Sequence, residues 1–247
     1  MNSDEEIGSP TSGALIEAEA RGARAACVLE PAVRPGGEFI TQRKGMWHIR
    51  AGVLGRAAHA GAAPEEGISA IEDLARKVTR LHALTGLRDG ITVNVGVIQG
   101  GTRMNVVAEE ARAEIDLRAR TPEDAQAALA EIRRILETSE VPGTCTEVDV
   151  ENLFPPMPRS PGSQRLYEMA RACGERIGLA IGEGSTGAGS DANRTAPLVP
   201  TLDGMGAIGA GSHSLDEHIR IRETVDRVKV LALFLHRLLG SDEAPGG

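Results

Sequence analysis

Hydrophobic and polar residues follow two periodicities in the middle of the chain, and these periodicities predict its secondary structure. Apolar residues occupy alternate positions in some stretches, as in half-buried β-strands, and recur at helical spacing in others. We expect strands at residues 47–53, 91–97, 113–117 and 145–150, and helices at residues 68–81 and 121–135. The order β-α-β-β-α-β is that of a ferredoxin-like α+β domain, in which two helices cover one face of a four-stranded sheet.

The segment before this region has the pattern of an α/β protein. Ser9-Pro10 is a typical cap and first residue for a short helix, which is expected at Gly13–Ala20. An apolar run at residues 25–29 predicts a buried parallel strand that ends in Glu30. An acid at the carboxyl end of a buried strand stands where α/β proteins place their sites.

The segment after a proline-rich hinge at residues 153–158 continues this pattern. A helix is expected at residues 164–177 and a strand at 199–208, and a closing helix ends at Gly240. The apolar stripe of the closing helix is expected at Val225, Val228, Leu231, Leu235 and Leu238. We therefore predict an α/β domain from residues 1–43 and 153–247, interrupted by an inserted α+β domain at residues 44–152.

The composition narrows the classes of function. The chain has 247 residues and a net charge of −8, which argues against a nucleic-acid partner. No apolar run approaches membrane-spanning length, so no membrane partner is expected. The three cysteines form no C-x-x-C pair, which argues against a thiolate zinc site and favours a reducing compartment such as the cytoplasm.

Acidic residues are crowded at the N-terminus. Asp4, Glu5 and Glu6 are consecutive, and adjacent carboxylates repel one another unless a positive charge lies among them. A divalent metal ion supplies this charge in many sites, with one carboxylate as ligand and its neighbour as base. With Glu30 and His213, these acids form a candidate site for zinc, manganese or cobalt. The same residues are also compatible with a solvated acidic terminus, a strand-end charge and a structural histidine.

Four motifs occur in the order in which a known family carries them. They are Asp4-Glu5-Glu6-Ile7-Gly8-Ser9, the strand ending in Glu30-Pro31, the loop Gly55–Gly61 and Gly211-Ser212-His213. Together they resemble the dinuclear zinc amidohydrolases and exopeptidases that include carboxypeptidase G, aminoacylase and succinyl-diaminopimelate desuccinylase. The stretch His59–Pro64 is most similar to the carboxypeptidase G type, and the resemblance covers essentially the whole chain.

The resemblance implies a fold and a chemistry. The flanking segments would form an incomplete zinc-exopeptidase-like catalytic domain, and residues 44–152 would form a lid through which two chains make a homodimer. Two zinc ions, or cobalt or manganese, would activate water to cleave the amide bond of an N-acyl amino acid or small peptide with a free carboxylate. Glu5 would be the general base. Glu6 and His213 would ligate one metal ion, and Glu30 the other.

The resemblance also implies substrate contacts. His59 would reach the site of the partner chain and stabilise the oxyanion of the tetrahedral intermediate. Asn105 and Arg118 match lid positions that hold the carboxylate of the substrate. Backbone N–H groups at a helix start would bind the same substrate, from Gly187, Gly189 and Ser190. Without the family, His59 would be a surface-loop histidine, Asn105 a turn residue and Arg118 an exposed strand charge.

The chain also departs from the family pattern. None of its six histidines begins a His-x-Asp motif, and the bridging aspartate and several strands of the central sheet are missing, which indicates the C-terminal part of a longer family member. With the bridge gone, too few ligands remain for two ions, so we expect weak or absent activity from this chain alone. Three interpretations stay open: a truncated metal-dependent hydrolase, an inactive remnant that dimerises through the lid, and a plain small-molecule binding domain.

Overall fold

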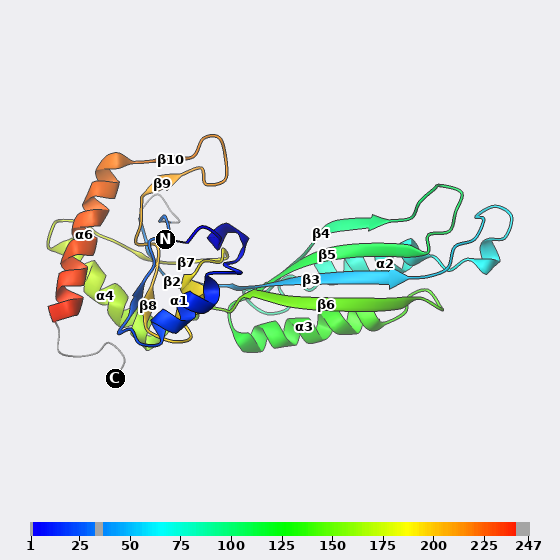
Figure 1. The fold of residues 1–247 in the computed structure, drawn as a ribbon, viewed down its shortest axis with the longest axis horizontal. Helices are drawn as coiled ribbons and strands as arrows, with labels where there is room; N and C mark the ends of the chain where they lie inside the picture. Colours follow the sequence, from blue (N-terminus) through cyan, green and yellow to red (C-terminus); the bar gives the residue numbers. More distant parts are fainter. Residues whose placement is uncertain (1, 33–36, 241–247) are drawn as a thin grey trace. The chain divides into compact units, whose positions relative to one another are not determined.

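The chain folds into two compact units in a computed structural model that describes residues 2–32 and 37–240 (Figure 1). The central unit is Gly45–Leu153, and the flanking unit combines Met1–Lys44 with Phe154–Gly247. Each unit has its own hydrophobic core. In the described part of the chain, no helix combines the length and the apolarity that crossing a membrane requires.

The central unit is built on a four-stranded sheet. Its elements are β3 (Gly45–Leu54), the 3-10 turn η2 (Pro64–Glu66), α2 (Ala70–His82), β4 (Thr92–Gly100), β5 (Glu110–Ala119), α3 (Pro122–Glu137) and β6 (Cys145–Phe154). The strand order is β4-β5-β3-β6, and both β3 and β4 are antiparallel to β5. This is the ferredoxin-like order that the hydrophobic pattern predicted.

One-sided burial of the strands positions the core of the central unit. Trp47 and Ile49 on β3, and Ile115 and Leu117 on β5, are at most 7% exposed, whereas residues between them point to the other face. The buried face packs against α3, where Ile132 is fully buried. The alternation read from the sequence therefore identifies which face of the sheet the helices cover.

Two apolar positions of the central unit differ from the prediction. Ile71 is 42% exposed because α2 turns Ala70 and Leu74 toward the sheet instead. Val97 is 40% exposed because the register of β4 against β5 shifts between Val95 and Val97. Since side chains alternate between the faces of a strand, a shift of one residue sends the following side chains to the opposite face.

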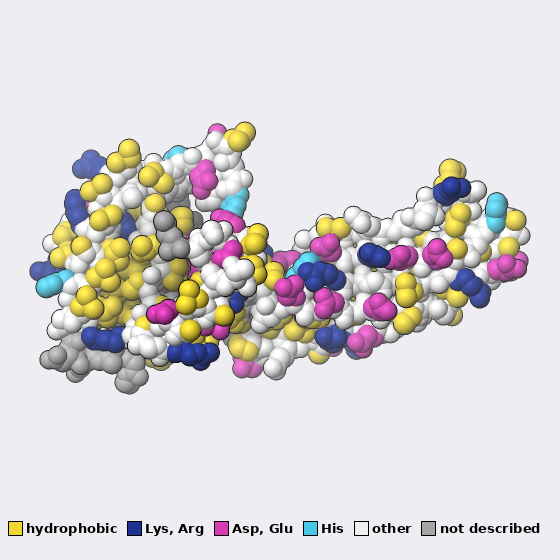
Figure 2. Space-filling model, viewed as in Figure 1, with side chains coloured by type: hydrophobic (Ala, Val, Ile, Leu, Met, Phe, Trp, Pro, Cys, Tyr) yellow, Lys and Arg dark blue, Asp and Glu magenta, His cyan; other side chains and the backbone are white. Residues whose placement is uncertain are grey.

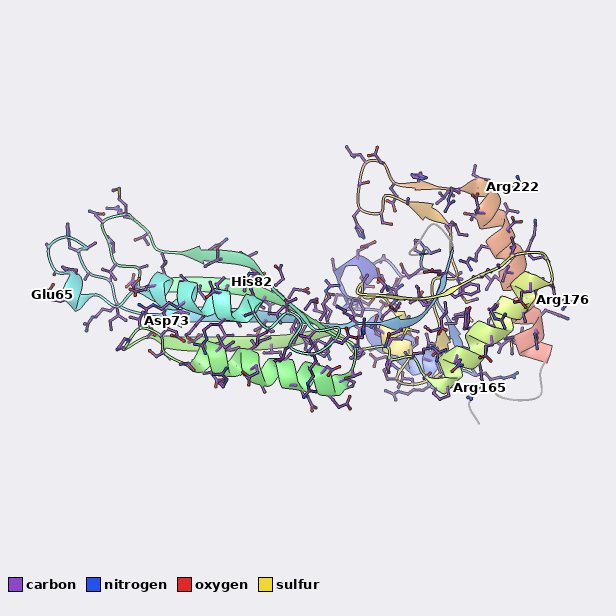
Figure 3. All side chains as sticks on the ribbon, turned by 180° about the vertical axis from the view of Figure 1, so that it is seen from behind. Glu65, Asp73, His82, Arg165, Arg176 and Arg222 are labelled. Atoms are coloured by element: carbon purple, nitrogen blue, oxygen red, sulfur yellow. The ribbon has the colours of Figure 1, made fainter. Side chains whose placement is uncertain are left out.

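A buried ion pair lies within α2, and its acid Asp73, which Figure 3 labels, is also hydrogen-bonded to the turn before β6. Lys77 Nζ lies 2.6 Å from Asp73 Oδ2, and both side chains are fully buried. Asp73 Oδ1 accepts hydrogen bonds from the backbone N–H groups of Glu140 and Val141 and from the Thr144 hydroxyl. The charge of Asp73 is thus compensated on both oxygens, which is the condition for burying it.

The flanking unit consists of helices and short strands. Its elements are η1 (Glu5–Ile7), α1 (Gly13–Ala20), β1 (Ala26–Cys27), β2 (Phe39–Arg43), α4 (Pro161–Glu175), β7 (Glu183–Thr186), α5 (Ala192–Thr195), β8 (Thr201–Leu202), β9 (Gly209–Ala210), β10 (His218–Ile219) and α6 (Ile221–Gly240). β1 pairs with β8 and β2 with β7, both in parallel, whereas β9 and β10 form an antiparallel hairpin. Phe39, Leu166, Leu202 and Phe234 are fully buried in its core.

Two features of the flanking unit differ from the local sequence signals. β1 and β8 are two residues long, in place of the longer strands predicted at 25–29 and 199–208. Ser9 does not cap a helix, because α1 begins after Ser12 and Ser9 is buried at a left-handed φ of 53°. The side chain of Ser9 is engaged elsewhere, with a residue far along the chain.

The closing helix α6 confirms only part of the predicted apolar stripe, in which Leu238 is buried and Leu231 packs against the core. Val225, Val228 and Leu235 are between 38% and 60% exposed. The buried residues of α6 are Arg227, Val230, Phe234 and Leu238. Apolar residues occur on both faces of this helix, so periodicity alone does not choose between them. Figure 2 shows the resulting broad apolar area on the flanking unit.

Candidate active site

The acidic residues near the N-terminus lie on the 3-10 turn η1. This turn is followed by Gly8 at a φ of 89° and by Ser9 at 53°, two consecutive left-handed residues. Such a φ is unfavourable for serine. Its cost is compensated by the surrounding structure, because Ser9 Oγ donates a hydrogen bond of 2.6 Å to Asp191 Oδ1. The acidic turn is therefore held against the segment that carries Asp191.

Asp4 stabilises the local fold. Its carboxylate oxygens accept hydrogen bonds of 2.6–3.1 Å from the hydroxyls and backbone N–H groups of Ser12 and Thr11. These bonds favour the ionised form and hold the pKa of Asp4 well below its usual range. Of the three consecutive acids, Asp4 is therefore occupied, and Glu5 and Glu6 are the two candidates for chemistry.

Glu5 differs from Asp4 because its pKa is shifted upward. Partial burial raises the pKa of Glu5 to about 7. The negative charges of Glu30, Asp191 and Glu6 act in the same direction, and the positive charge of Arg43 acts against it. Near neutral pH the carboxyl is consequently divided between its two protonation states. This state suits a group that accepts a proton and then returns it.

Glu30 follows β1 at the carboxyl end of that strand. Gly206 packs so closely here that a Cβ on it would lie 2.1 Å from the carbonyl oxygen of Leu29, which only glycine avoids. Burial, and after it the charge of Asp203, raises the pKa of Glu30. Because Glu30 also raises the pKa of Glu5, the two carboxyls belong to one electrostatic group.

A buried ion pair lies within electrostatic range of both acids. Arg43 Nε lies 2.5 Å from Asp203 Oδ2, and neither side chain is more than 3% exposed. Arg43 also donates to the carbonyl oxygens of Ala188 and Gly189, and Ser190 Oγ donates to Asp203 Oδ2 over 2.8 Å. This network joins the end of β2 to the glycine loop between β7 and α5.

His213 is brought next to Glu6. It lies between β9 and β10 at a φ of 63°, and its Nε2 is 3.9 Å from Glu6 Oε2. This distance is too long for a direct hydrogen bond, and both side chains are 77% exposed. Two of the three predicted metal ligands thus lie side by side, and Glu30 lies near enough to Glu6 for their charges to interact.

These side chains meet part of the requirement of a metal site. Within residues 2–32 and 37–240, no group of three or more His, Cys, Asp or Glu residues is placed to hold a metal ion. Glu6 and His213 have donor atoms of the type that zinc, cobalt or manganese binds. A catalytic zinc ion needs more protein ligands than this pair, so the described residues supply an incomplete set.

The glycine loop between β7 and α5 is stabilised from within. The Ser190 N–H donates to Asn193 Oδ1 over 3.0 Å, and Ser190 is fully buried. Gly189 packs on Phe154, where a Cβ would lie 2.6 Å from the ring. The amide of Ser190 is therefore committed to the loop. This differs from the predicted substrate contact, because α5 is too short to present a row of free amides.

The central unit brings His59 and Asn105 together. The Ala60 N–H donates to the carbonyl oxygen of Asn105 over 3.0 Å, and His59 forms a β-bridge with Val106. Both His59 and Asn105 are exposed. Two residues that the sequence placed in separate loops therefore lie at the same end of the central sheet.

Arg118 lies toward the other end of this sheet. Glu110, the first residue of β5, pairs with Leu54 at the His59 end, whereas Arg118 pairs with Met46. The separation along β5 is 118 − 110 = 8 residues, or about 26 Å at ~3.3 Å per residue. Arg118 Nε lies 2.9 Å from Asp116 Oδ2. A single central unit therefore does not offer Asn105 and Arg118 to the same small carboxylate.

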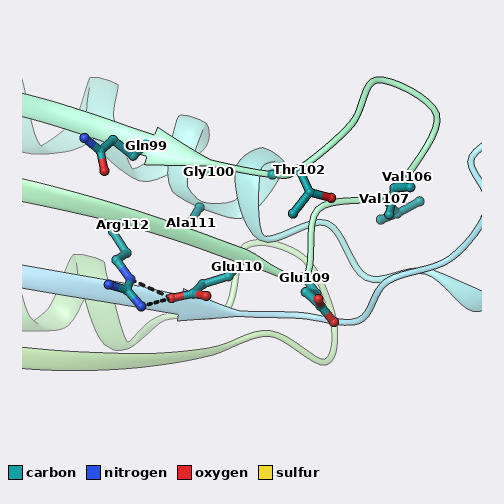
Figure 4. Close-up of a pocket in the computed structure, with 10 residues that line it drawn as sticks. Gln99, Gly100, Thr102, Val106, Val107, Glu109, Glu110, Ala111 and Arg112 are labelled. Carbon is teal, nitrogen blue, oxygen red and sulfur yellow. Dashed lines mark hydrogen bonds and ion pairs between the residues drawn. The ribbon is translucent and has the colours of Figure 1, made fainter.

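An open pocket of about 220 Å³ lies beside the loop that follows Asn105 (Figure 4). Its lining includes Val106, Val107 and Thr102. The charged residues Glu110 and Arg112 in the wall form an ion pair with each other. Glu109 also lines the pocket, so its wall carries a net negative charge.

Sequence reasoning missed three residues of the candidate site: Arg43, Asp191 and Asp203. Asp191 follows the glycine loop and accepts a hydrogen bond from the Ser9 hydroxyl, a long-range contact that has no local signal. Asp203 directly follows β8, and an acid at a strand end is the signal that identified Glu30. Arg43 stands at the end of an apolar strand, where a fully buried arginine implies a buried acidic partner.

The comparisons with known proteins identify the class. Residues 41–144 match the model of the Peptidase dimerisation domain. The chain is 28% identical over 216 residues to Carboxypeptidase G2 of Pseudomonas sp. (strain RS-16). The aligned region covers 87% of this chain and 52% of that protein. It is 29% identical over 202 residues to the uncharacterized protein YqjE of Bacillus subtilis (strain 168), covering 81% of this chain and 53% of YqjE.

The structure is similar to that of aminopeptidase PepT from Bacillus cereus ATCC 10987. The TM-score is 0.82 at 25% identity, covering 94% of this chain and 62% of PepT. The chain thus contains a peptidase dimerisation domain and is similar, over most of its length, to peptidases and amidohydrolases such as carboxypeptidase G2, as its motifs indicated. It spans about half the length of the curated relatives described above.

Proposed function

We propose that this chain serves in the metal-dependent hydrolysis of an amide bond in an N-acyl amino acid or small peptide that has a free carboxylate. The observation that carries the proposal is the convergence of Glu6 and His213, 3.9 Å apart, beside the partly protonated Glu5. The similarity to carboxypeptidase G2 supports a hydrolase of this class.

In this proposal Glu5 is the general base. It takes a proton from the water that attacks the scissile carbonyl carbon, and it returns that proton to the nitrogen of the leaving amine. A pKa near 7 fits both transfers, because the carboxyl is neither too weak a base nor too weak an acid. The C–N bond breaks as the tetrahedral intermediate collapses, and the carboxylic acid and the amine are released.

The metal ions would be held by Glu6 and His213 on one side and by Glu30 on the other. Zinc is the expected ion, with cobalt or manganese as substitutes that accept the same carboxylate and imidazole donors. When bound, such an ion lowers the pKa of a coordinated water and polarises the carbonyl. The described residues supply only part of the ligand set, so the ions would need further ligands.

The central unit would act as a lid and as the surface through which two copies form a homodimer. His59 of one copy would donate to the oxyanion in the other copy, and Asn105 and Arg118 would hold the substrate carboxylate. The distance between Asn105 and Arg118 within one sheet favours a site assembled from two copies. Gly187 and Gly189 would approach the same substrate, with Ser190 holding their loop.

The experiment compares Glu5→Gln with Glu19→Gln, an exposed acid on α1 that serves as the matched control. Release of free amine is measured from N-acyl amino acids with free and with amidated carboxylates, with added zinc and with chelator. We expect weak turnover of this chain, seen only with metal and a free carboxylate, and a further loss of about 100-fold or more in Glu5→Gln alone. Metal content should stay equal in both variants.

A second candidate function follows from the incomplete ligand set: an inactive remnant that dimerises through the central unit. A folded dimer that retains no metal and releases no amine from any of these substrates would establish it and would end the hydrolase proposal. A cytoplasmic location is part of the proposal, because three scattered cysteines with no C-x-x-C pair favour a reducing compartment.

A further inference from the structure

The ring of His59 is held by the backbone of its own loop. The Gly61 N–H donates to His59 Nδ1 over 3.2 Å, and the Ala62 N–H donates to the same nitrogen over 3.1 Å. The Ala62 N–H is shared, because it also lies 3.2 Å from the carbonyl oxygen of His59. Among the described residues the Gly61 N–H has no second acceptor, so it is the more specific donor to the ring.

Hydrogen-bond chemistry then decides where the ring proton resides. A neutral imidazole has one N–H and one lone pair in the ring plane, and the nitrogen that accepts a hydrogen bond is the one without the proton. Since Nδ1 of His59 accepts from backbone amides, the proton is on Nε2. The exposed edge of the ring therefore presents a hydrogen-bond donor.

The loop that imposes this arrangement is itself anchored in the central unit. The Ala60 N–H donates to the backbone carbonyl oxygen of Asn105, and the Val107 N–H donates to the carbonyl oxygen of Ala58 over 2.9 Å. A Cβ on Gly61 would meet His59 Cε1 at 3.7 Å, an ordinary contact, so the loop tolerates a side chain there. The position of the Gly61 amide relative to the ring is thus set by the backbone.

We infer that the Gly61 amide is a positioning group that holds His59 as the Nε2–H tautomer. His59 then meets its ligand as a donor to an oxygen acceptor, such as a carbonyl or carboxylate oxygen. It offers no free lone pair to a metal ion or to an ammonium group. The tautomer follows from the geometry of the loop alone, whereas the identification of the oxygen with that of the scissile amide rests on the proposed function.

His218 provides a contrast within the same chain. Its Nδ1 lies 2.9 Å from the backbone carbonyl oxygen of Asp216. A carbonyl oxygen can only accept, so Nδ1 of His218 must carry the proton and Nε2 the lone pair. The structure therefore assigns opposite tautomers to His59 and His218.

The tautomers are measured by two-bond ¹H–¹⁵N correlation NMR of the ¹⁵N-labelled full chain at pH 8, where neutral imidazoles are observed. Signals are assigned by their loss in His59→Asn and His218→Asn. We expect a pyridine-type Nδ1 and a pyrrole-type Nε2 for His59, and the reverse for His218. A pyrrole-type Nδ1 in His59, or averaged shifts that show both tautomers, would overturn the inference. Turnover is not needed, so a failed hydrolase proposal leaves this result unaffected.

Two variants test the role of the Gly61 amide. Gly61→Pro removes the N–H, and Gly61→Ala retains it as the matched control. We expect averaged His59 shifts in the proline variant and wild-type shifts in the alanine variant, with unchanged backbone amide shifts of β3 and β5 showing that the central unit is folded. Wild-type His59 shifts in both variants would mean that Gly61 does not position the ring. If the proline variant does not fold, the wild-type spectrum still decides the tautomer.

Discussion

Glu6 Oε2 and His213 Nε2 lie 3.9 Å apart, although their residues stand near opposite ends of the flanking unit's sequence. The N-terminal turn η1 brings one partner and the hairpin of β9 and β10 the other. Neither segment has the regular structure that would predict this meeting locally. The convergence supports the proposal of a site at the acidic turn, whereas the carboxylate of Asp4 accepts hydrogen bonds from Ser12 and Thr11.

The buried pair of Arg43 and Asp203 predicts a large effect on stability. Asp203→Ala leaves the guanidinium of Arg43 buried without its carboxylate, and we expect the free energy of unfolding to fall by about 3–5 kcal/mol. Urea denaturation measures this loss. Glu175→Ala, which removes the partner of Arg171 in an exposed pair, is the control and should change stability by less than about 1 kcal/mol. Equal effects of the two variants would contradict the prediction.

The buried face of α6 predicts different costs for two valines. Val230 is fully buried and Val228 is 60% exposed, although the hydrophobic pattern put Val228 on the core face. Val230→Ala should destabilise the flanking unit by about 2 kcal/mol through the lost contacts and the cavity left behind. Val228→Ala should change stability by no more than about 0.5 kcal/mol, because alanine favours a helix and little packing is lost. Thermal or urea unfolding compares the two variants. A larger loss of stability in Val228→Ala than in Val230→Ala would mean that α6 packs on the core with its other face.

Burial predicts the order in which the three thiols react. Cys145 is exposed, Cys173 is buried, and burial raises the pKa of Cys27 to about 11. Since the thiolate is the nucleophile, Cys27 is expected to react slowly at pH 8 even where reagent can approach it. Labelling with iodoacetamide followed by peptide mass spectrometry should show rapid modification of Cys145 alone. Early modification of Cys27 or Cys173 in the folded protein would contradict the assigned burial.

The pair of Glu183 and Arg159 predicts a dependence of stability on pH. The hydrogen bonds from Arg159, with partial help from Thr41, lower the pKa of Glu183 in the folded chain below its ordinary value of 4.5. A lowered pKa means that the stabilisation is present above pH 4.5 and is lost as the pH falls through the lower folded value. Because the pair is partly solvated, its contribution to the free energy of unfolding should stay below about 1 kcal/mol.

Glu183→Gln measures this contribution, with Glu131→Gln in the more exposed pair with Arg134 as the control. Between about pH 5 and pH 3, the melting temperature of the wild type should fall more steeply than that of Glu183→Gln. The control variant should follow the wild type. If the melting temperatures of the wild type and of Glu183→Gln fall in parallel with pH, the pair does not lower the pKa of Glu183 enough to affect stability.

The sequence by itself determined the central sheet and the resemblance to the peptidases and amidohydrolases. Alternation at Trp47 and Ile49, and again at Ile115 and Leu117, sets strands whose one face must be buried, because side chains alternate strictly along a strand. The element order then leaves few ways to arrange four strands. The motifs around Glu5 and His213 indicated the family, because their types, order and spacing are all visible in one chain.

Only the tertiary structure decided which faces and which partners these residues use. Val228 is exposed because α6 has apolar residues on both faces, and packing against Phe39 and its neighbours selects one of them. Ser9 does not cap the helix, because its hydroxyl donates a hydrogen bond to Asp191. Arg43 forms an ion pair with Asp203, which is far from it in the sequence. Local periodicity follows from the geometry of the backbone, which a short stretch of sequence already contains. Long-range pairing depends on the free energy of the whole packed unit, and no short stretch contains that information.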